Sequence, residues 1–289
     1  MCNFKIMTDS NSDMPLTYLK ENDVEVVHLS YMIDGETYSK DKQLESKDFY
    51  TRMRNGSMAT TSQVNPSDAR EVMESLLEDS KDILCISFSS ALSGTYNSCR
   101  MAAVELMEER DDINIIVVDT LAASMGQGLL IHKAVEMRNA GKTIEEIAEW
   151  LETYKGNAVQ IFTVDDLFHL FRGGRVSKTS AVVGTMINVK PILHVNPEGA
   201  LVAVGKVRGR KKSLKALVDG MEERLGSYQG KNDIVFISHA DALEDAEYVR
   251  DLVKEKYAID QFILNDIGPA IGAHSGPGTV ALFFFGDVR

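Results

Sequence analysis

The chain has 289 residues, of which 44% are hydrophobic, and its 31 basic and 43 acidic side chains leave a net charge of −12. This length suits one large or two ordinary domains, and the acidic balance argues against broad nucleic-acid binding. No apolar run is long enough to cross a membrane, and the N-terminus leads straight into a predicted strand. We therefore expect a cytoplasmic protein without a signal peptide or a transmembrane segment, and its three cysteines form no disulfide framework.

Short apolar strands alternate with helices through the first half of the chain. We predict strands at 4–8, 24–29, 83–88 and 113–118, a small hairpin at 31–38, a polar loop at 59–66, and helices at 15–22, 46–55, 67–77, 126–140, 143–154 and directly after residue 94. Strands that alternate with helices indicate a parallel α/β sheet, in which ligands bind beyond the carboxyl ends of the strands.

The pattern changes after about residue 156. We predict strands at 158–164, 189–195, 200–207, 233–239, 261–267 and 280–285, and helices at 165–171, 180–187, 211–225 and 243–256. The tight turn at 196–199 joins two adjacent strands, which favours a mixed or antiparallel sheet. The fold class is therefore α/β with two domains: a parallel-sheet domain over residues 1–156 and an α+β domain over residues 157–289.

Hydroxyl side chains gather at the turn that follows strand 83–88. Ser93, Gly94 and Thr95 stand just before a predicted helix. The N-terminus of a helix has free backbone N–H groups and a positive dipole end, so an anion is expected to bind there. The alternative is that Ser93 simply caps the helix, which is the commoner role of a serine at such a position.

Three further motifs carry side chains suited to an anion. Thr61 and Ser62 belong to a run of hydroxyls in the predicted polar loop, where a simple turn is the alternative. Arg175 ends an Arg-Gly-Gly-Arg sequence, and a guanidinium pairs with carboxylates or phosphates through a planar fork. His274 lies in a Gly/Pro-rich stretch, 268–278, where we expect an accessible loop.

Two other features allow different functions. Asp9 follows the first strand and is either a phosphoryl acceptor or, as we favour, a residue that forms a turn through its side chain; Asp119 occupies a similar place. The basic run 208–212 suits an acidic partner or a phosphate, and a solvated helix start explains it equally well. The sequence has no nucleotide-binding, nucleophile-elbow or metal-ligand motif.

Taken together and in order, these motifs resemble the DegV family of bacterial fatty-acid-binding proteins. The matching pieces are 7–10, 60–63, 89–96, 119–120, 173–175, 206–208, and Gly268-Pro269 with His274. The resemblance implies two α/β domains that enclose an acyl chain. It implies that Thr61 and Ser93 hold the carboxylate, with Arg175 and His274 near the head group.

The resemblance also implies a partner, because some members carry the lipid for a fatty acid kinase. The basic side chains of Arg208, Arg210 and Lys211 are similar to the surface proposed to meet that kinase. We therefore predict a non-catalytic carrier of a long-chain fatty acid such as palmitate, without a cofactor, whose ligand also contacts Ser62, Gly94 and Thr95. The alternatives are a phosphotransferase or phosphatase that uses Asp9 on a small substrate, and an interaction protein that acts through residues 208–212.

Overall fold

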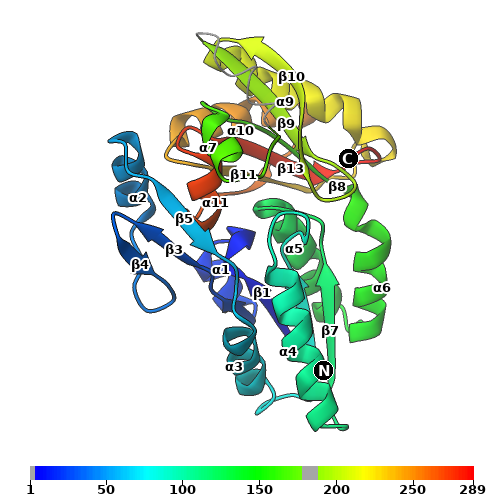
Figure 1. Cartoon of the computed structure of the whole chain (residues 1–289). Coiled ribbons are helices and arrows are strands. Elements are labelled where there is room, and N and C mark those ends of the chain that lie inside the picture. The colour runs from blue at the N-terminus through cyan, green and yellow to red at the C-terminus, as the bar shows by residue number, and fades with distance from the viewer. Residues whose placement is uncertain (1–3, 178–187) are drawn as a thin grey trace.

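The computed structural model describes residues 4–177 and 188–289. Figure 1 shows one sheet in the lower part of the molecule and a second, larger sheet in the upper part, with a small third sheet beside them. The helix that we predict at 180–187 lies outside the described residues.

The lower sheet has four strands in the order β2-β1-β6-β7, and every neighbouring pair is parallel. Its strands are β1 (Phe4–Asp9), β2 (Val24–Val27), β6 (Asp82–Ser87) and β7 (Asn114–Asp119). The helical segments that belong to it are η1 (Ser10–Ser12), α1 (Leu16–Glu21), α3 (Pro66–Leu76), α4 (Thr95–Glu109), α5 (Met125–Asn139) and α6 (Ile144–Tyr154). The predicted parallel α/β arrangement is confirmed. Helices α3 and α4 cover one face of the sheet, and α1, α5 and α6 cover the other.

The small sheet is antiparallel, with the order β4-β3-β5. It consists of β3 (Ser30–Ile33), β4 (Glu36–Tyr38) and β5 (Ala59–Ser62), and α2 (Ser46–Arg54) packs beside it. The predicted hairpin is confirmed as β3 and β4. The predicted polar loop at 59–66 is wrong in its first half, because β5 pairs with β3 and sets Thr61 opposite Tyr31. The β-branched threonines of this segment suit a strand in spite of their polarity.

The upper sheet is mixed, with the order β10-β9-β8-β13-β11-β12. Its strands are β8 (Ala158–Thr163), β9 (Val189–Val195), β10 (Leu201–Arg208), β11 (Ile234–His239), β12 (Gln261–Asp266) and β13 (Val280–Phe285). The helical segments with it are η2 (Lys155–Asn157), α7 (Phe168–Arg172), α9 (Arg210–Leu225), η4 (Gly226–Tyr228), α10 (Leu243–Tyr257) and α11 (Pro269–Ser275). Strands β11 and β12 are parallel and the other described pairs are antiparallel, which confirms the predicted mixed sheet.

The predicted loop at 268–278 is wrong in its first part, where α11 forms. Pro269 occupies the first turn of this helix, where its fixed φ fits and its missing N–H is not needed. Gly276 ends the helix with a φ of 77°, a value that favours glycine. Gly268 and Gly276 therefore mark the two ends of a helix, and Gly272 lies inside it.

Helix α5 lies between the two large sheets (Figure 1). Nine of its side chains or glycines are buried, and one hydrophobic cluster joins Leu84 and Ile86 of the lower sheet to Phe162 and Phe283 of the upper one. The first two turns, residues 125–131, are buried on all sides, whereas the charged residues Lys133, Glu136 and Arg138 lie in the second half of the helix. Because the two sheets share this core, the division of the chain between residues 156 and 157 stays a prediction.

A buried polar network joins the two sheets beside α5. Asp13 follows η1; its Oδ2 lies 2.5 Å from Ser124 Oγ, and its Oδ1 accepts a hydrogen bond of 2.8 Å from the Gly268 N–H. Ser124 Oγ lies 2.9 Å from Ser238 Oγ of β11. Burial, with smaller contributions from the nearby Asp266 and Asp9, raises the pKa of Asp13 to about 8. A protonated Asp13 donates to Ser124, which leaves Ser124 free to donate to Ser238.

We expect Asp13→Asn to remove a pH dependence of stability. The unfolded carboxyl titrates near 3.8 and the folded one near 8, so between these values the folded state holds a proton that the unfolded state has lost. The contribution of Asp13 to the free energy of unfolding therefore falls as pH rises through this window, with a slope of up to about 1.4 kcal/mol per pH unit. Asparagine reproduces the donor and acceptor of the protonated acid. Urea denaturation of both proteins at pH 5 to 8 measures how the free energy of unfolding changes with pH. If this free energy changes with pH in the same way for both proteins, Asp13 is ionised in the folded state.

Candidate functional site

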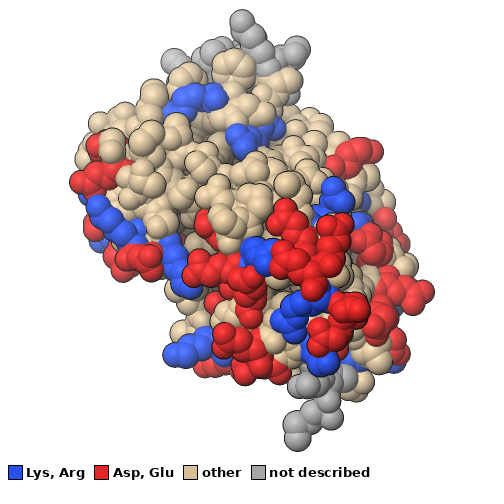
Figure 2. All heavy atoms as spheres, turned by 60° about the horizontal axis from the view of Figure 1, so that its bottom comes forward, with Lys and Arg blue, Asp and Glu red and all other residues tan. Residues whose placement is uncertain are grey.

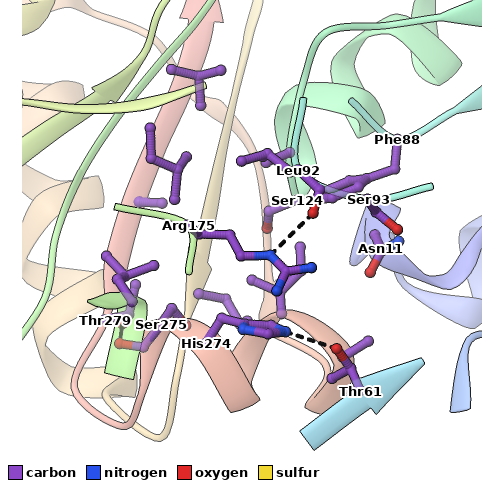
Figure 3. Close-up of a pocket in the computed structure, with 18 of the residues that line it drawn as sticks. Asn11, Thr61, Phe88, Leu92, Ser93, Ser124, Arg175, His274, Ser275 and Thr279 are labelled. Atoms are coloured by element: carbon purple, nitrogen blue, oxygen red, sulfur yellow. Dashed lines mark hydrogen bonds between the residues drawn. The ribbon is translucent and has the colours of Figure 1, made fainter. Parts of the chain in front are cut away.

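A cavity of about 230 Å³ lies where the lower, small and upper sheets meet (Figure 3). Its polar lining includes Asn11, Thr61, Gln63, Ser93, Ser124, Gln160, Arg175, His274, Ser275 and Thr279. Its apolar lining includes Leu29, Phe88, Leu92, Phe162, Leu170, Val195, Leu201, Ile267, Ile271, Ala281 and Phe283. The cavity is thus apolar over much of its wall, with polar groups brought together from segments far apart in the chain.

Thr61 and His274 meet at one end of the cavity. Thr61 projects from β5 and His274 from the last turn of α11, and Thr61 Oγ1 lies 2.8 Å from His274 Nε2. His274 is half-buried on a helix, which corrects the prediction of an accessible loop. Burial, with the positive charges of Arg175 and Arg172, lowers its pKa to about 4, so the imidazole is neutral at physiological pH.

Ser93 faces the same end of the cavity from the loop between β6 and α4 (Figure 3). Its Oγ lies 2.9 Å from Thr95 Oγ1 and accepts a hydrogen bond of 3.3 Å from the Thr95 N–H. Thr95 is fully buried and does not line the cavity, so the structure places it behind Ser93. Gly94 lines the cavity between them and caps α4.

Gln63 was not among the predicted site residues, although it ends the Thr-Thr-Ser-Gln motif. Its carboxamide lies over Gly94, since a Cβ at that glycine would stand 2.1 Å from Gln63 Oε1. Its Nε2 donates a hydrogen bond of 3.0 Å to Ser98 Oγ in α4. Gly94 has an ordinary φ of −74°, so glycine is needed here for close approach and not for backbone conformation.

Arg175 extends its guanidinium between Ser93 and His274 (Figure 3). Its Nε donates to the Leu92 carbonyl at 3.1 Å, and its Nη1 donates to the Gly173 carbonyl at 2.5 Å. These bonds hold the side chain in the cavity wall, and burial lowers its pKa without removing the charge. The structure therefore brings Thr61, Ser93, Arg175 and His274 together, as predicted.

Two predicted residues lie elsewhere. Ser62 is exposed on β5 and does not line the cavity, because successive strand side chains point to opposite faces and Thr61 faces inward. Asp9 is buried, and its carboxylate accepts hydrogen bonds from Phe88 N, Ser87 Oγ and Asn11 N at 2.8 to 3.1 Å. Asp9 therefore shapes a turn beneath the sheet edge and is enclosed from any substrate.

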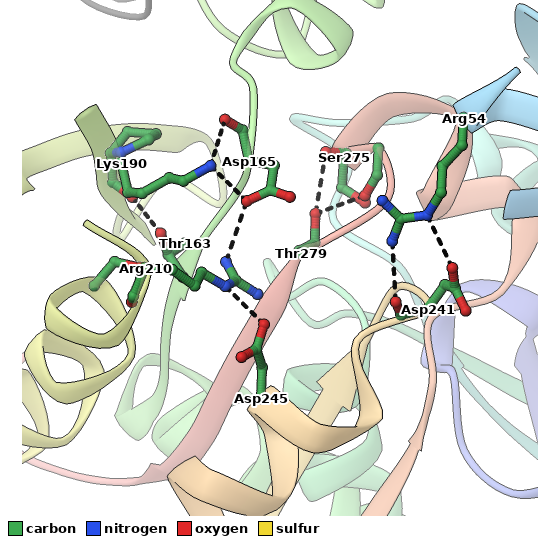
Figure 4. A network of polar contacts seen from close by, with 12 residues as sticks. Arg54, Thr163, Asp165, Lys190, Arg210, Asp241, Asp245, Ser275 and Thr279 are labelled. Carbon is green, nitrogen blue, oxygen red and sulfur yellow. Dashed lines mark hydrogen bonds and ion pairs between the residues drawn. The ribbon is translucent and has the colours of Figure 1, made fainter. Parts of the chain in front are cut away.

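The residues of the basic run differ in their surroundings. Arg208 and Lys211 are exposed at the end of β10 and the start of α9. Arg210 forms ion pairs instead, with Nε 2.7 Å from Asp245 Oδ2 and Nη1 3.6 Å from Asp165 Oδ1 (Figure 4). Arg210 therefore anchors the first turn of α9, whereas Arg208 and Lys211 face solvent.

The acidic excess lies away from this basic run. Figure 2 shows Asp and Glu gathered on the lower part of the molecule, among fewer Lys and Arg. Exposed acids of α3 and α4 contribute there, and Arg70 pairs with Glu74 and Glu109. In the described ranges, no helix is long and apolar enough to cross a bilayer, and no group of three or more His, Cys, Asp and Glu side chains is arranged to hold a metal ion.

A model of the DegV family, described as uncharacterised proteins of that family, matches residues 3–287. This chain belongs to the DegV family. A DegV domain-containing protein of Clostridium perfringens is 43% identical over 291 residues, covering 100% of this chain and 99% of its own. One of Streptococcus pyogenes is 36% identical over 286 residues and covers 98% of each chain.

Solved DegV structures share the whole fold. A fatty-acid-binding DegV protein of Thermus thermophilus matches with a TM-score of 0.87 and 28% identity, covering 98% of this chain and 99% of that one. A DegV lipid-binding protein of Thermotoga maritima matches with 0.85 and 30%, covering 100% of both. A stearic-acid-binding protein of Eubacterium ventriosum matches with 0.88 and 26%, covering 98% of both. This DegV protein therefore has relatives described as fatty-acid-binding proteins.

We expect Asp9→Asn to lower the free energy of unfolding by about 1–3 kcal/mol. Phe88, Asn11 and Gln127 all donate hydrogen bonds to the Asp9 carboxylate. The NH₂ group of an asparagine cannot accept them, so donors would face donors. Asp13→Asn is the matched control. Ser124 Oγ can accept from the new amide N–H, and the amide oxygen can accept from the Gly268 N–H. Urea denaturation at pH 7 measures both variants, and an Asp9→Asn protein as stable as wild type would show that Asp9 is protonated in the fold.

Proposed function

We propose that this DegV protein binds a long-chain fatty acid in the cavity between its sheets. The observation that carries the proposal is the distribution of chemistry along the cavity wall. Hydroxyls and a guanidinium gather at one end, at Thr61, Ser93 and Arg175, while apolar side chains from strands of the upper sheet and from neighbouring loops and helices line much of the rest. A molecule with an acidic head and an apolar tail matches both parts.

The head group is assigned to the polar end. The hydroxyls of Thr61 and Ser93 and the backbone N–H of Gly94 donate to the carboxylate, and the guanidinium of Arg175 provides the countercharge. His274 remains neutral and supports Thr61 through their 2.8 Å contact. Hydrogen bonds to an ionised group contribute about 1.5–3 kcal/mol each, which orients the head group.

The tail supplies the larger part of the affinity. Each methylene removed from water contributes about 0.8 kcal/mol, so a sixteen-carbon chain contributes on the order of 10 kcal/mol before the cost of ordering it. The side chains of Phe162, Leu201 and Phe283 provide the apolar surface that this chain covers.

According to this proposal, the protein is a carrier that presents its lipid to a fatty acid kinase, and it is not itself an enzyme. The solved relatives support lipid binding, and the enclosure of Asp9 removes the main nucleophile that the sequence offers. The kinase is proposed to meet the surface formed by Arg208 and Lys211, with Arg210 holding the first turn of α9 in place. An acidic surface on the partner would complement these charges.

We expect purified protein to yield long-chain fatty acid on extraction and mass spectrometry, and to bind added palmitate. Ser93→Ala and Thr61→Val should each weaken palmitate binding by about fivefold or more, since each removes one donor to the carboxylate. Ser62→Ala is the matched control and should bind as wild type does. Absence of acyl chains from the extract, together with no binding of added palmitate, would contradict the proposal.

We expect the double substitution Arg208→Glu and Lys211→Glu to slow acyl-phosphate formation by a fatty acid kinase and ATP, with palmitate binding unchanged. Reversing two exposed charges lowers the association rate with an acidic partner surface, and the defect should grow at low salt. The double substitution Lys20→Glu and Lys40→Glu is the charge-matched control, because it reverses two exposed charges on other surfaces. Equal rates for the double variant and wild type would exclude this surface as the kinase contact.

A further inference from the structure

The hydrogen bonds around Ser93 define which way its hydroxyl group points. The Thr95 N–H donates to Ser93 Oγ at 3.3 Å, and Thr95 Oγ1 lies 2.9 Å from the same oxygen. Either hydroxyl is a possible donor in the second contact, so the direction has to be deduced from the other partners of Thr95.

Thr95 has one available acceptor for its own proton. Its Oγ1 already accepts a hydrogen bond of 3.3 Å from the Val64 N–H, and its side chain is fully buried. Of the two described partners of Thr95 Oγ1, the Val64 N–H can only donate, so Ser93 Oγ is the one that can accept the Thr95 proton. A buried hydroxyl proton without an acceptor is costly, so Thr95 donates to Ser93.

Ser93 then accepts twice from Thr95, once from the backbone N–H and once from the hydroxyl. A hydroxyl oxygen has two acceptor sites and one proton. Both acceptor sites of Ser93 are filled, so the group can only donate to a molecule in the cavity. The chain of bonds runs from Val64 N–H to Thr95, from Thr95 to Ser93, and from Ser93 to the ligand.

Two other side chains at this end also present donors. Arg175 carries donors and no acceptor. His274 Nδ1 is buried without a partner in the described structure, and a buried N–H without an acceptor is rarer than an unfilled acceptor. The proton therefore sits on Nε2, which donates to Thr61 Oγ1 and leaves the Thr61 proton free for the ligand.

We propose that Thr95 is a positioning residue that makes Ser93 a donor-only group at the head-group end of the cavity, which favours lipids with an ionised head over neutral lipids of the same chain length. This inference rests on the proposed fatty-acid binding and adds a discrimination to it. A carboxylate only accepts hydrogen bonds and fills such a site. A fatty alcohol brings its own proton, for which Ser93 and Arg175 provide no acceptor.

The test compares hexadecanoate with 1-hexadecanol, each measured by displacement of a fluorescent fatty acid. Wild type should prefer hexadecanoate by about tenfold or more. Thr95→Val keeps the shape but frees an acceptor site on Ser93, so this preference should fall by about fivefold or more. Thr95→Ser keeps the hydroxyl and should keep the preference. Ser98→Ala breaks the Gln63 bond on the same helix turn without touching Ser93, and it too should keep the preference.

The ratio of the two affinities separates polarity from packing, because a loosened loop weakens both lipids equally. An unchanged ratio in Thr95→Val would overturn the inference, and Thr95→Ala gives the same comparison if the valine variant does not fold. If wild type binds the alcohol as tightly as hexadecanoate, the inference fails and the proposed function stands. If wild type binds neither lipid, both fail.

Discussion

The arrangement of the whole molecule depends on the burial of α5 between two sheets. The first seven residues of this helix, 125–131, are all buried, so no single sheet can cover that part of it. Gly126 and Gly128 allow the close approach, since a Cβ at either would lie within 2.6 Å of Gln160 or Met14 atoms. Two sheets that share a helix cannot close fully against each other beyond its end, and the cavity lies there, with Ala123 and Ser124 of the preceding loop in its wall.

The same geometry explains which parts of the site were predictable from sequence. Ser93 is predictable because a strand, a turn and a helix follow one another locally, and that pattern is visible in the residues themselves. The hydroxyl motif points to Thr61 but not to its strand, because the pairing with β3 joins residues some thirty positions apart in the chain. The helix that carries His274 is not predictable, because glycines that end a helix look like glycines that prevent one.

The apolar wall of the cavity was not predictable at all. Phe162, Leu201 and Phe283 belong to different strands, and each has the sequence pattern of an ordinary core position. Whether such a side chain faces another side chain or an empty space depends on how the sheets are set apart, which periodicity does not encode. Gln63 is an intermediate case, since its motif was recognised but its contact with Gly94 depends on the distance between β5 and α4.

Asp9 and Asp13 show how burial alone leaves the state of a carboxyl undecided. Both are buried within a few residues of each other, and burial raises both pKa values. Donors surround Asp9 and fit a carboxylate, whereas Asp13 has one N–H donor, from Gly268, and faces the Ser124 hydroxyl, which accepts as readily as it donates. The direction of the neighbouring hydrogen bonds thus favours the carboxylate form at Asp9 more than at Asp13.

The direction of hydrogen bonds also bears on what chemistry the head-group end can support. Catalysis on a carboxyl needs a group that takes or gives a proton, and the one titratable imidazole here is neutral and bonded to Thr61. Donors fixed by buried partners hold an anion firmly without polarising it toward reaction with a group of this chain. On the proposed function, chemistry on the head group comes from a second protein, and that protein would have to reach the loop that carries Ser93.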